Sequence, residues 1–186
     1  MTMARKGNKQ NVVQEVELRL DLGCGPNKVD PSWTGADIRK FPGVDVVCDL
    51  RKRWPWENNS VAQAYSSHFI EHLEAMDRVW FINELYRVLK PGAQATLIAP
   101  HWASSRAYGD LTHKWPPISE FWPAYLDAQW RAANAPHNDF YTCDFTHVEG
   151  PAVRQDLQAR NQEYQQFAVV NFKDAIADIH IHLTKR

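Results

Sequence analysis

The sequence of 186 residues has few cysteines, almost no net charge and no long apolar run, and each of these shortages excludes a class of protein. Its three cysteines, Cys24, Cys48 and Cys143, are odd in number and widely spaced, which indicates reduced thiols rather than a disulfide framework. The formal net charge of -1 argues against a protein built mainly to hold phosphate backbones. No apolar run reaches the roughly 18 residues of a membrane span or forms the core of a signal peptide, so we expect a cytoplasmic protein that does not contact a membrane.

The length and composition predict one globular domain. Hydrophobic residues make up 44% of the chain, which is enough for a sizeable core. Residues 1–11, "MTMARKGNKQN", are basic and are expected to form a disordered leader, with residues 12–186 as the single domain. Eight tryptophans are unusual for this length and indicate thick aromatic packing or an aromatic-lined pocket.

Strand and helix patterns alternate along the chain. Apolar runs bounded by turn residues predict strands over 16–22, 33–38, 44–50, 61–66, 93–100, 140–148 and 174–185. Helices are predicted over 70–90, ending at Pro91 and Gly92, and over 118–134 and 153–165, with an irregular segment over 101–117. This order predicts an α/β fold: a Rossmann-like, mostly parallel sheet of about six to seven strands, with helices on both faces and an antiparallel last strand.

Polar residues follow several of the predicted strands. In such sheets, ligands bind at the carboxyl ends of the strands, so these residues are expected to line one crevice. They are Asp21 to Gly25, Asp37, Asp49, Ser66 to His68, and His101.

The stretch "LDLGCGPNK", residues 20–28, is a glycine loop without the features of a phosphate site. A dinucleotide fingerprint needs a third glycine and a helix that follows it, but Lys28 occupies the third position and no long helix follows. The chain also has no GKS or GKT sequence of a P-loop. A glycine loop after a strand usually brings the backbone close to a ligand, but read alone this loop does not select one: it could hold NAD, a phosphate or nothing.

Four segments together resemble the class I S-adenosylmethionine-dependent methyltransferases. They are "LDLGCG", the acid of "GADI", the acid of "VVCDL", and the block "SSHFIEHL" through "RVLKPGAQATLIAP". The resemblance covers about residues 18–100. It is strongest to a compact, methyltransferase type 11-like branch in which "LGCGPNK" leads almost directly to "WTGADI", without a long first helix.

The resemblance implies S-adenosylmethionine as cofactor and assigns its contacts. Asp37 is expected to bind the ribose diol and Asp49 the adenine amino group. Asp21, with the backbones of Gly23 and Gly25, is expected to face the methionine end. The remaining contacts implied by the resemblance are Cys24, Ile38, Leu50, Ser66 and His68.

Methyl transfer needs a base only when the acceptor must lose a proton. The candidates at the predicted crevice are His68, His72, His101, Asp110 and His113. Of these, we expect His68, just after the fourth predicted strand, and His113, in the loop "YGDLTHKW", to take part in catalysis.

A metal ion is an alternative reading of the same region. In "HFIEH", His68, Glu71 and His72 have the spacing of one helix face and of the inverted zinc-peptidase signature. The flanking strand, loop and helix match the methyltransferase pattern instead, which argues against a peptidase. The segment also resembles methyltransferases that hold a divalent ion on an E-x-x-E-H motif and a later histidine, here His113. Because His68 replaces the first glutamate and imidazole suits Mg²⁺ poorly, we expect no metal; those four residues would be the ligands if one bound.

The segment 101–137 is expected to form the acceptor side. Its aromatic residues indicate a planar, sugar-like or nucleobase acceptor, or else core packing; they are Trp102, Tyr108, Trp115, Trp122 and Trp130. We expect methyl transfer to a hydroxyl or amine of a small metabolite or saccharide. Two alternatives stay open: a nucleic-acid methyltransferase, and a catalytically inactive cofactor-binding interaction protein.

Overall fold

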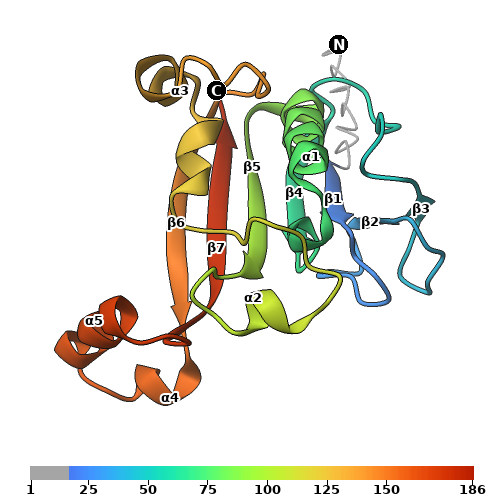
Figure 1. Cartoon of the computed structure of the whole chain (residues 1–186). Coiled ribbons are helices and arrows are strands. Elements are labelled where there is room, and N and C mark those ends of the chain that lie inside the picture. The colour runs from blue at the N-terminus through green and yellow to red at the C-terminus, as the bar shows by residue number, and fades with distance from the viewer. Residues whose placement is uncertain (1–16) are drawn as a thin grey trace, which may run out of the picture.

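The computed structural model describes residues 17–186, so the expected leader over 1–11 lies outside the described residues. Seven strands form one sheet in the order β3-β2-β1-β4-β5-β7-β6 (Figure 1). The strands are β1 (Leu18–Leu22), β2 (Thr34–Asp37), β3 (Val46–Val47), β4 (Val61–Ser67), β5 (Leu89–Pro100), β6 (Phe145–Val153) and β7 (Ile176–Lys185). Strand β7 runs antiparallel to β5 and β6, while the pairs among β1 to β5 are parallel. This confirms the predicted sheet and its antiparallel last strand.

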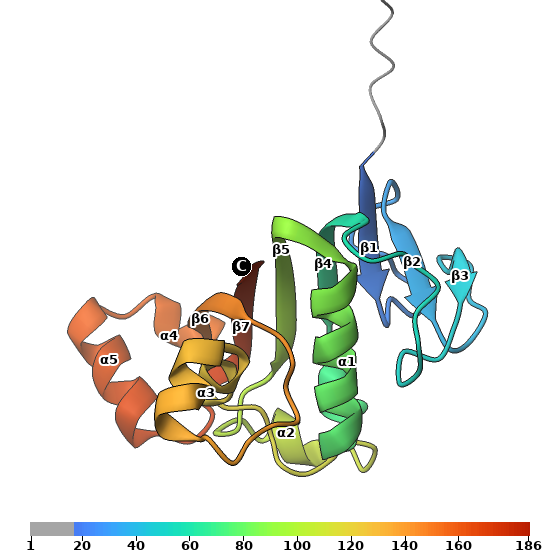
Figure 2. The same cartoon turned by 90° about the horizontal axis from the view of Figure 1, so that it is seen from above.

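The helices pack mainly on one side of this sheet. They are the short 3₁₀ turns η1 (Ile70–His72) and η2 (Trp122–Leu126) and the helices α1 (Ala75–Val88), α2 (Arg106–Gly109), α3 (Ala128–Asn134), α4 (Gln155–Gln158) and α5 (Gln162–Asn171). Helices α1 and α3 lie on the same face, and α4 and α5 flank the end of the sheet beside β6 (Figure 2). The expected helices on both faces are therefore found on one face within residues 17–186. The reason is that β1 connects to β2, and β2 to β3, through loops without a helix.

The core fills the space between the sheet and α1. Leu20, Leu97 and Ile181 come from three strands and are at most 1% exposed. They belong to one cluster with Phe81 and Leu85 of α1. Burying a side chain of this size contributes about 1.5–3 kcal/mol, so this single face supplies most of the hydrophobic stabilisation.

The opposite face of the sheet is polar. Strand pairing puts Asp21 beside Tyr65, Tyr65 beside Thr96, and Thr96 beside His182 in one row across four strands. Thr96 Oγ1 lies 3.1 Å from Nδ1 of His182, which is exposed. A face without packed helices needs no apolar side chains, which accounts for the polar Arg19 on β1.

Two predicted helices begin or end elsewhere than expected. The predicted helix over 70–90 starts as the turn η1, breaks at Leu73, and ends at Val88 because β5 already begins at Leu89. The predicted helix over 118–134 is divided at Asp127, whose carboxylate accepts the N–H groups of Gln129 (2.8 Å) and Trp130 (3.0 Å) and so starts α3.

The last third of the chain differs in its boundaries as well. Strand β6 covers 145–153 rather than 140–148, because it pairs with β7 along its length. The predicted helix over 153–165 appears as α4 and α5, with Asn161 capping the second by accepting the N–H of Tyr164 at 2.9 Å. No helix among the described residues is both long and apolar enough to cross a membrane.

Candidate functional site

The glycine loop turns back on β2 directly after β1. Gly23 and Gly25 have φ values of 73° and 54°, in the left-handed region that glycine adopts most readily. The N–H groups of Gly23 and Cys24 donate to the carbonyl of Ala36 at 2.8 and 3.2 Å. A Cβ on Gly23 would lie 2.3 Å from Cδ2 of Phe69, so only glycine fits there.

A small cavity, which we call the β1 notch, opens beside this loop. Its volume is about 220 Å³, and it is lined by Asp21, Gly23, Cys24, Asn27, Val29, Tyr65 and Ser67. Asp21 is 2% exposed and accepts the N–H of Val29 at 2.7 Å. Burial raises the pKa of Asp21, while the Val29 N–H and the charge of Lys28 oppose the rise. The notch therefore offers a buried acidic group to a cationic ligand.

Asp37 stands at the end of β2, next to the glycine loop. Its Oδ2 accepts the N–H of Gly25 at 3.0 Å and its Oδ1 accepts the N–H of Arg39 at 2.9 Å. A carboxylate has about four acceptor positions, so each oxygen keeps one for a ligand. The neighbouring Ile38 side chain is 53% exposed and can cover an apolar ring.

Asp49, after β3, is already paired. Its oxygens accept hydrogen bonds from the Arg51 guanidinium at 2.9 and 3.0 Å, and this pairing lowers the pKa of Asp49. The N–H of Arg51 donates to Oδ1 as well, at 3.0 Å. Asp49 thus has less acceptor capacity left than Asp37. Leu50 is 2% exposed, and its side chain belongs to the core.

Two further predicted contacts have structural roles. Ser66 is buried, and its hydroxyl donates to the carbonyl of Leu22 at 2.8 Å, which joins β4 to β1. Burial together with the charges of Asp21 and Asp37 raises the pKa of Cys24 to about 11, so the side chain is a neutral thiol at neutral pH. It lines the β1 notch as a small polarisable group.

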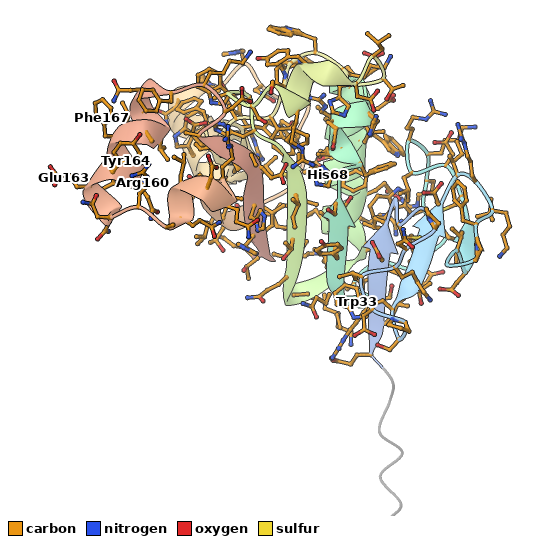
Figure 3. All side chains as sticks on the ribbon, turned by 90° about the horizontal axis from the view of Figure 1, so that it is seen from below. Trp33, His68, Arg160, Glu163, Tyr164 and Phe167 are labelled. Atoms are coloured by element: carbon orange, nitrogen blue, oxygen red, sulfur yellow. The ribbon has the colours of Figure 1, made fainter. Side chains whose placement is uncertain are left out.

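His68 follows β4 and lies near the middle of the sheet's width (Figure 3). Its Nδ1 is 3.3 Å from Glu71 Oε1 and its Nε2 is 3.9 Å from Asp178 Oδ2 on β7. The hydrogen bond to Glu71 raises the pKa of His68, against the effect of burial. Arg106 of α2 holds Asp178 through contacts of 2.8 and 3.0 Å. His68 therefore connects the end of β4 with the end of β7.

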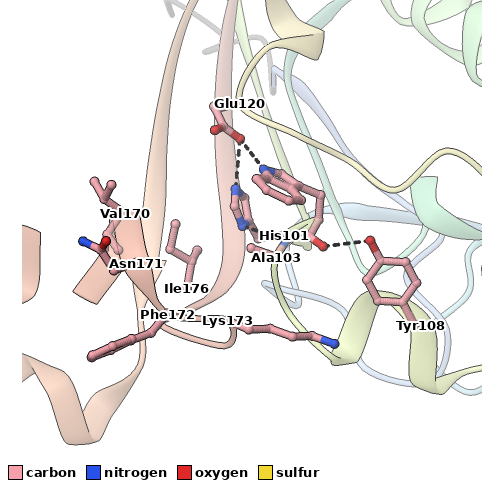
Figure 4. Close-up of a pocket in the computed structure, with 11 residues that line it drawn as sticks. His101, Ala103, Tyr108, Glu120, Val170, Asn171, Phe172, Lys173 and Ile176 are labelled. Carbon is pink, nitrogen blue, oxygen red and sulfur yellow. Dashed lines mark hydrogen bonds and ion pairs between the residues drawn. The ribbon is translucent and has the colours of Figure 1, made fainter. Parts of the chain in front are cut away.

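A larger cavity, which we call the β5 pocket, lies past the end of β5 (Figure 4). Its volume is about 710 Å³, and it is lined by His101, Trp102, Ala103, Tyr108, Glu120, Val169, Val170, Asn171, Phe172, Lys173 and Ile176. Glu120 accepts hydrogen bonds from His101 Nε2 (3.0 Å) and Trp102 Nε1 (2.8 Å). Burial would raise the pKa of Glu120, but hydrogen bonds from its own backbone, His101 and Trp102 lower it.

His101 is a buried, hydrogen-bonded part of the pocket lining. It is 3% exposed, and its Nδ1 accepts the N–H of Ala103 at 3.2 Å. The proton of the neutral ring must then be on Nε2, which donates it to Glu120. Because both ring nitrogens are occupied, His101 fixes the position of Glu120 and is not a free base.

Sequence reasoning missed most residues of this pocket, among them the two charged residues and one aromatic residue: Glu120, Lys173 and Phe172. Glu120 lay inside a predicted helix, and the other two precede the last strand without a motif. Of the five predicted acceptor-side aromatics, Trp102 and Tyr108 line the β5 pocket, whereas Trp115 lines a separate cavity of about 250 Å³. Trp122 donates to the hydroxyl of Tyr141 at 3.0 Å, and Trp130 packs edge-on to Tyr125.

His113 does not line the β5 pocket; it lines the separate cavity of about 250 Å³ together with Trp115. One metal-ligating atom each of Glu71, His72 and His113 lies within 4.8 Å of the other two. The ring centroids of the two histidines are 4.8 Å apart. The structure thus brings together three of the four residues that the sequence suggested for a metal, while His68 contacts this group through Glu71.

The geometry agrees with comparisons to known proteins. A family model described as "Methyltransferase domain" matches residues 36–97. A S-adenosylmethionine-dependent methyltransferase from Archaeoglobus fulgidus is 16% identical, with a TM-score of 0.60 over 91% of this chain and 86% of that one. The geranyl diphosphate C-methyltransferase of Streptomyces coelicolor, solved with Mg²⁺, geranyl diphosphate and S-adenosylhomocysteine, is 14% identical, with a TM-score of 0.51 over 91% of this chain and 71% of that one. At such identities the structures show a common fold.

No curated protein matches the sequence. The family match runs from Ala36, within β2, to Leu97, within β5, and the glycine loop and the antiparallel β7 lie outside it. The matched segment and the seven-stranded sheet together show that the chain has the fold of the class I S-adenosylmethionine-dependent methyltransferases.

Proposed function

We propose that the protein transfers a methyl group from S-adenosylmethionine to a hydroxyl or amine of a small metabolite or saccharide. One observation carries the proposal: the β1 notch and the β5 pocket open at the same carboxyl edge of the sheet, at the ends of strands β1, β4 and β5. His68, at the end of β4, lies between them. Two cavities at one edge suit a cofactor and an acceptor that must meet.

The residues of the first cavity fit the methionine end of the cofactor. The buried carboxylate of Asp21 complements an ammonium group, and Gly23 keeps the backbone close enough for contact. At about 220 Å³ the notch is below the roughly 300–1,000 Å³ of most ligand pockets. The nucleoside would therefore lie along the outer edge of the sheet, with its ribose on Asp37 and its adenine beside Ile38 and Asp49.

When bound, the cofactor supplies a methyl group that an acceptor lone pair takes as the carbon–sulfur bond breaks, leaving S-adenosylhomocysteine. The protein's part is to orient the acceptor and exclude water. Trp102, Tyr108 and Phe172 would hold the flat or apolar faces of an acceptor, and Glu120 and Lys173 its polar groups. His68 stays our prediction for the group that receives the acceptor's proton.

The shape of the β5 pocket favours a small acceptor over a nucleic acid. A volume of about 710 Å³ lies within the range of small-molecule sites. The net charge of -1 gives no general attraction for a polyanion. A nucleic-acid acceptor and an inactive cofactor-binding protein are the competing outcomes of the test that follows.

The test is methyl transfer from isotopically labelled S-adenosylmethionine into separated metabolite, glycan and nucleic-acid fractions of a cell extract. We expect label in a small-molecule or saccharide fraction. Tyr108→Ala should raise the KM for that acceptor without changing cofactor affinity, since Tyr108 lines the β5 pocket. Tyr164→Ala, on α5 and outside that lining, is the matched control. Label confined to nucleic acid, or cofactor binding without any transfer, would overturn the proposal.

A further inference from the structure

Glu71, His72 and His113 form a cluster that the proposed methyl transfer does not use. They come from the turn η1 and from the loop that follows α2, so separate parts of the chain bring them together. A potential ligand atom of each lies within 4.8 Å of the other two. Two imidazoles and one carboxylate at this separation are the donor set of many divalent transition-metal sites.

The carboxylate of this cluster is incompletely satisfied. Glu71 is 4% exposed, and its Oε2 has no hydrogen-bond partner among the described residues. Its other oxygen, Oε1, lies 3.3 Å from Nδ1 of His68. A buried carboxylate oxygen without a partner is costly, which points to a cation that completes its environment.

Both histidines carry their ring proton on Nδ1. Nδ1 of His113 faces the carbonyl of Ala107 at 3.2 Å, and a carbonyl only accepts, so Nδ1 carries the proton. The Thr112 hydroxyl donates to the Asp110 carboxylate at 2.7 Å and therefore accepts from Nδ1 of His72 at 2.9 Å. Each ring keeps an Nε2 lone pair for a ligand. Hydrogen bonds from the second ring nitrogen to an oxygen commonly orient metal-binding histidines in this way.

Arg78 of α1 fixes the two segments that carry the cluster. It is 4% exposed, and its guanidinium donates to the carbonyls of Leu73 (2.9 Å), Lys114 (2.8 Å) and Pro116. The N–H of Lys114 donates in turn to the carbonyl of Glu71 at 2.8 Å. Hydrogen bonds to backbone carbonyls, from the Arg78 side chain and the Lys114 N–H, thus set the position of the His113 loop without an ion.

We infer that Glu71, His72 and His113 bind a divalent transition-metal ion, of which zinc is the representative. Three protein ligands leave a coordination position for water or for an oxygen or nitrogen of an exogenous ligand. Two imidazoles disfavour Mg²⁺ and Ca²⁺, which take oxygen ligands. His68, which the sequence suggested as a further ligand, stands behind Glu71 instead, because its Nδ1 contacts the carboxylate's Oε1 and its Nε2 is directed to Asp178.

The experiment titrates the tag-free full-length chain with Co²⁺, followed by its visible absorption and by competition with Zn²⁺. The expected result is one equivalent of bound Co²⁺ that Zn²⁺ displaces. His72→Ala and His113→Ala should each weaken binding by about tenfold or more. His137→Ala, an exposed histidine outside the cluster, is the matched control and should bind like the wild type.

Circular dichroism of each variant separates loss of binding from loss of folding, and Glu71→Gln provides a variant of nearly unchanged shape. Zn²⁺ should raise the Tm of the wild type and leave that of Glu71→Gln almost unchanged. The inference is overturned if the wild type binds less than stoichiometric Co²⁺, or if Glu71→Gln and His113→Ala bind it as the wild type does. Both readouts are taken without S-adenosylmethionine, so they are independent of the proposed methyl transfer.

Discussion

Replacing Gly23 by alanine tests the tight turn that brings the backbone to the β1 notch. Gly23 has a φ of 73°, where an alanine costs about 1 kcal/mol. The added Cβ would also lie 2.3, 2.4 and 2.7 Å from Cδ2, Cγ and Cβ of Phe69. Because Phe69 is anchored by its own Cβ and packs against Phe81, it cannot move aside freely. Overpacking of this kind costs about 1–3 kcal/mol, which brings the expected loss to about 2–4 kcal/mol.

The measurement is urea unfolding of Gly23→Ala and Gly25→Ala beside the wild type. Gly25 also has a positive φ, 54°, but a Cβ there would meet nothing within 4 Å, so its substitution should cost only about 1 kcal/mol. The difference between the two variants isolates the contact with Phe69. Equal stabilities would refute the packing argument, since both variants share the backbone strain.

Three further predictions concern other parts of the fold. Asp127→Ala should cost about 1–2 kcal/mol, and Asp127→Asn less, because Asn keeps the capping oxygen. The hydrogen bond from Arg186 lowers the pKa of Asp127 from 3.8 to about 2, so the charge-dependent part of this stabilisation is complete above about pH 4 and is lost as the pH falls through 2. In urea unfolding, an alanine penalty at pH 2 as large as that at pH 7 would contradict this. Cys24, with a pKa of about 11, should react with iodoacetamide at pH 8 far more slowly than a model thiol. Peptide mass spectrometry measures the rate, and a rate equal to that of the model thiol would contradict the raised pKa. Lys185→Met should lower stability by about 2–4 kcal/mol in thermal unfolding, because Lys185 Nζ donates to the carbonyls of Tyr86 (2.6 Å) and Leu89 (2.8 Å); an unchanged Tm would refute this.

The succession of strands along the chain and the glycine loop were predictable because local chemistry specifies them. Gly23 and Gly25 need positive φ values, and the acids Asp21 and Asp37 stand directly at strand ends, so their common edge follows from the parallel sheet. The existence of the last strand, β7, was also predictable from its alternating apolar residues, whereas this pattern does not specify the strand's direction. These features depend on neighbours in sequence or on a general rule of sheet topology.

The β5 pocket and the Arg78 contacts depend on residues far apart in sequence. Glu120 contacts His101, which is 19 residues away in sequence, and Arg78 donates to the carbonyl of Lys114, which is 36 residues away. No sequence pattern predicts either contact. The split at Asp127 was missed for a different reason. Its capping role competes with a helical pattern on both sides, and tertiary packing decides between them.

One face of the sheet carries no packed helix among the described residues, although the fold class was predicted correctly and helices were expected on both faces. The short loops after β1 and β2 were visible in the sequence, yet helices on both faces were expected from the fold class alone. Polar residues such as Gln94 and His182, both exposed, are the sequence sign of that face. They alternate with buried residues of the same strands, since Gln94 precedes Ala95 on β5 and His182 follows Ile181 on β7.

Calorimetric titration with S-adenosylmethionine and S-adenosylhomocysteine tests the central claim most directly. The wild type should bind one equivalent of either compound. Asp37→Asn should weaken binding about tenfold or more, because it removes a charged acceptor from the ribose diol. Asp30→Asn, an exposed acid on the adjacent loop, is the control and should bind as the wild type does. Absence of binding at millimolar cofactor, or an Asp37→Asn variant that binds like the wild type, would contradict the assignment of this edge of the sheet to the cofactor.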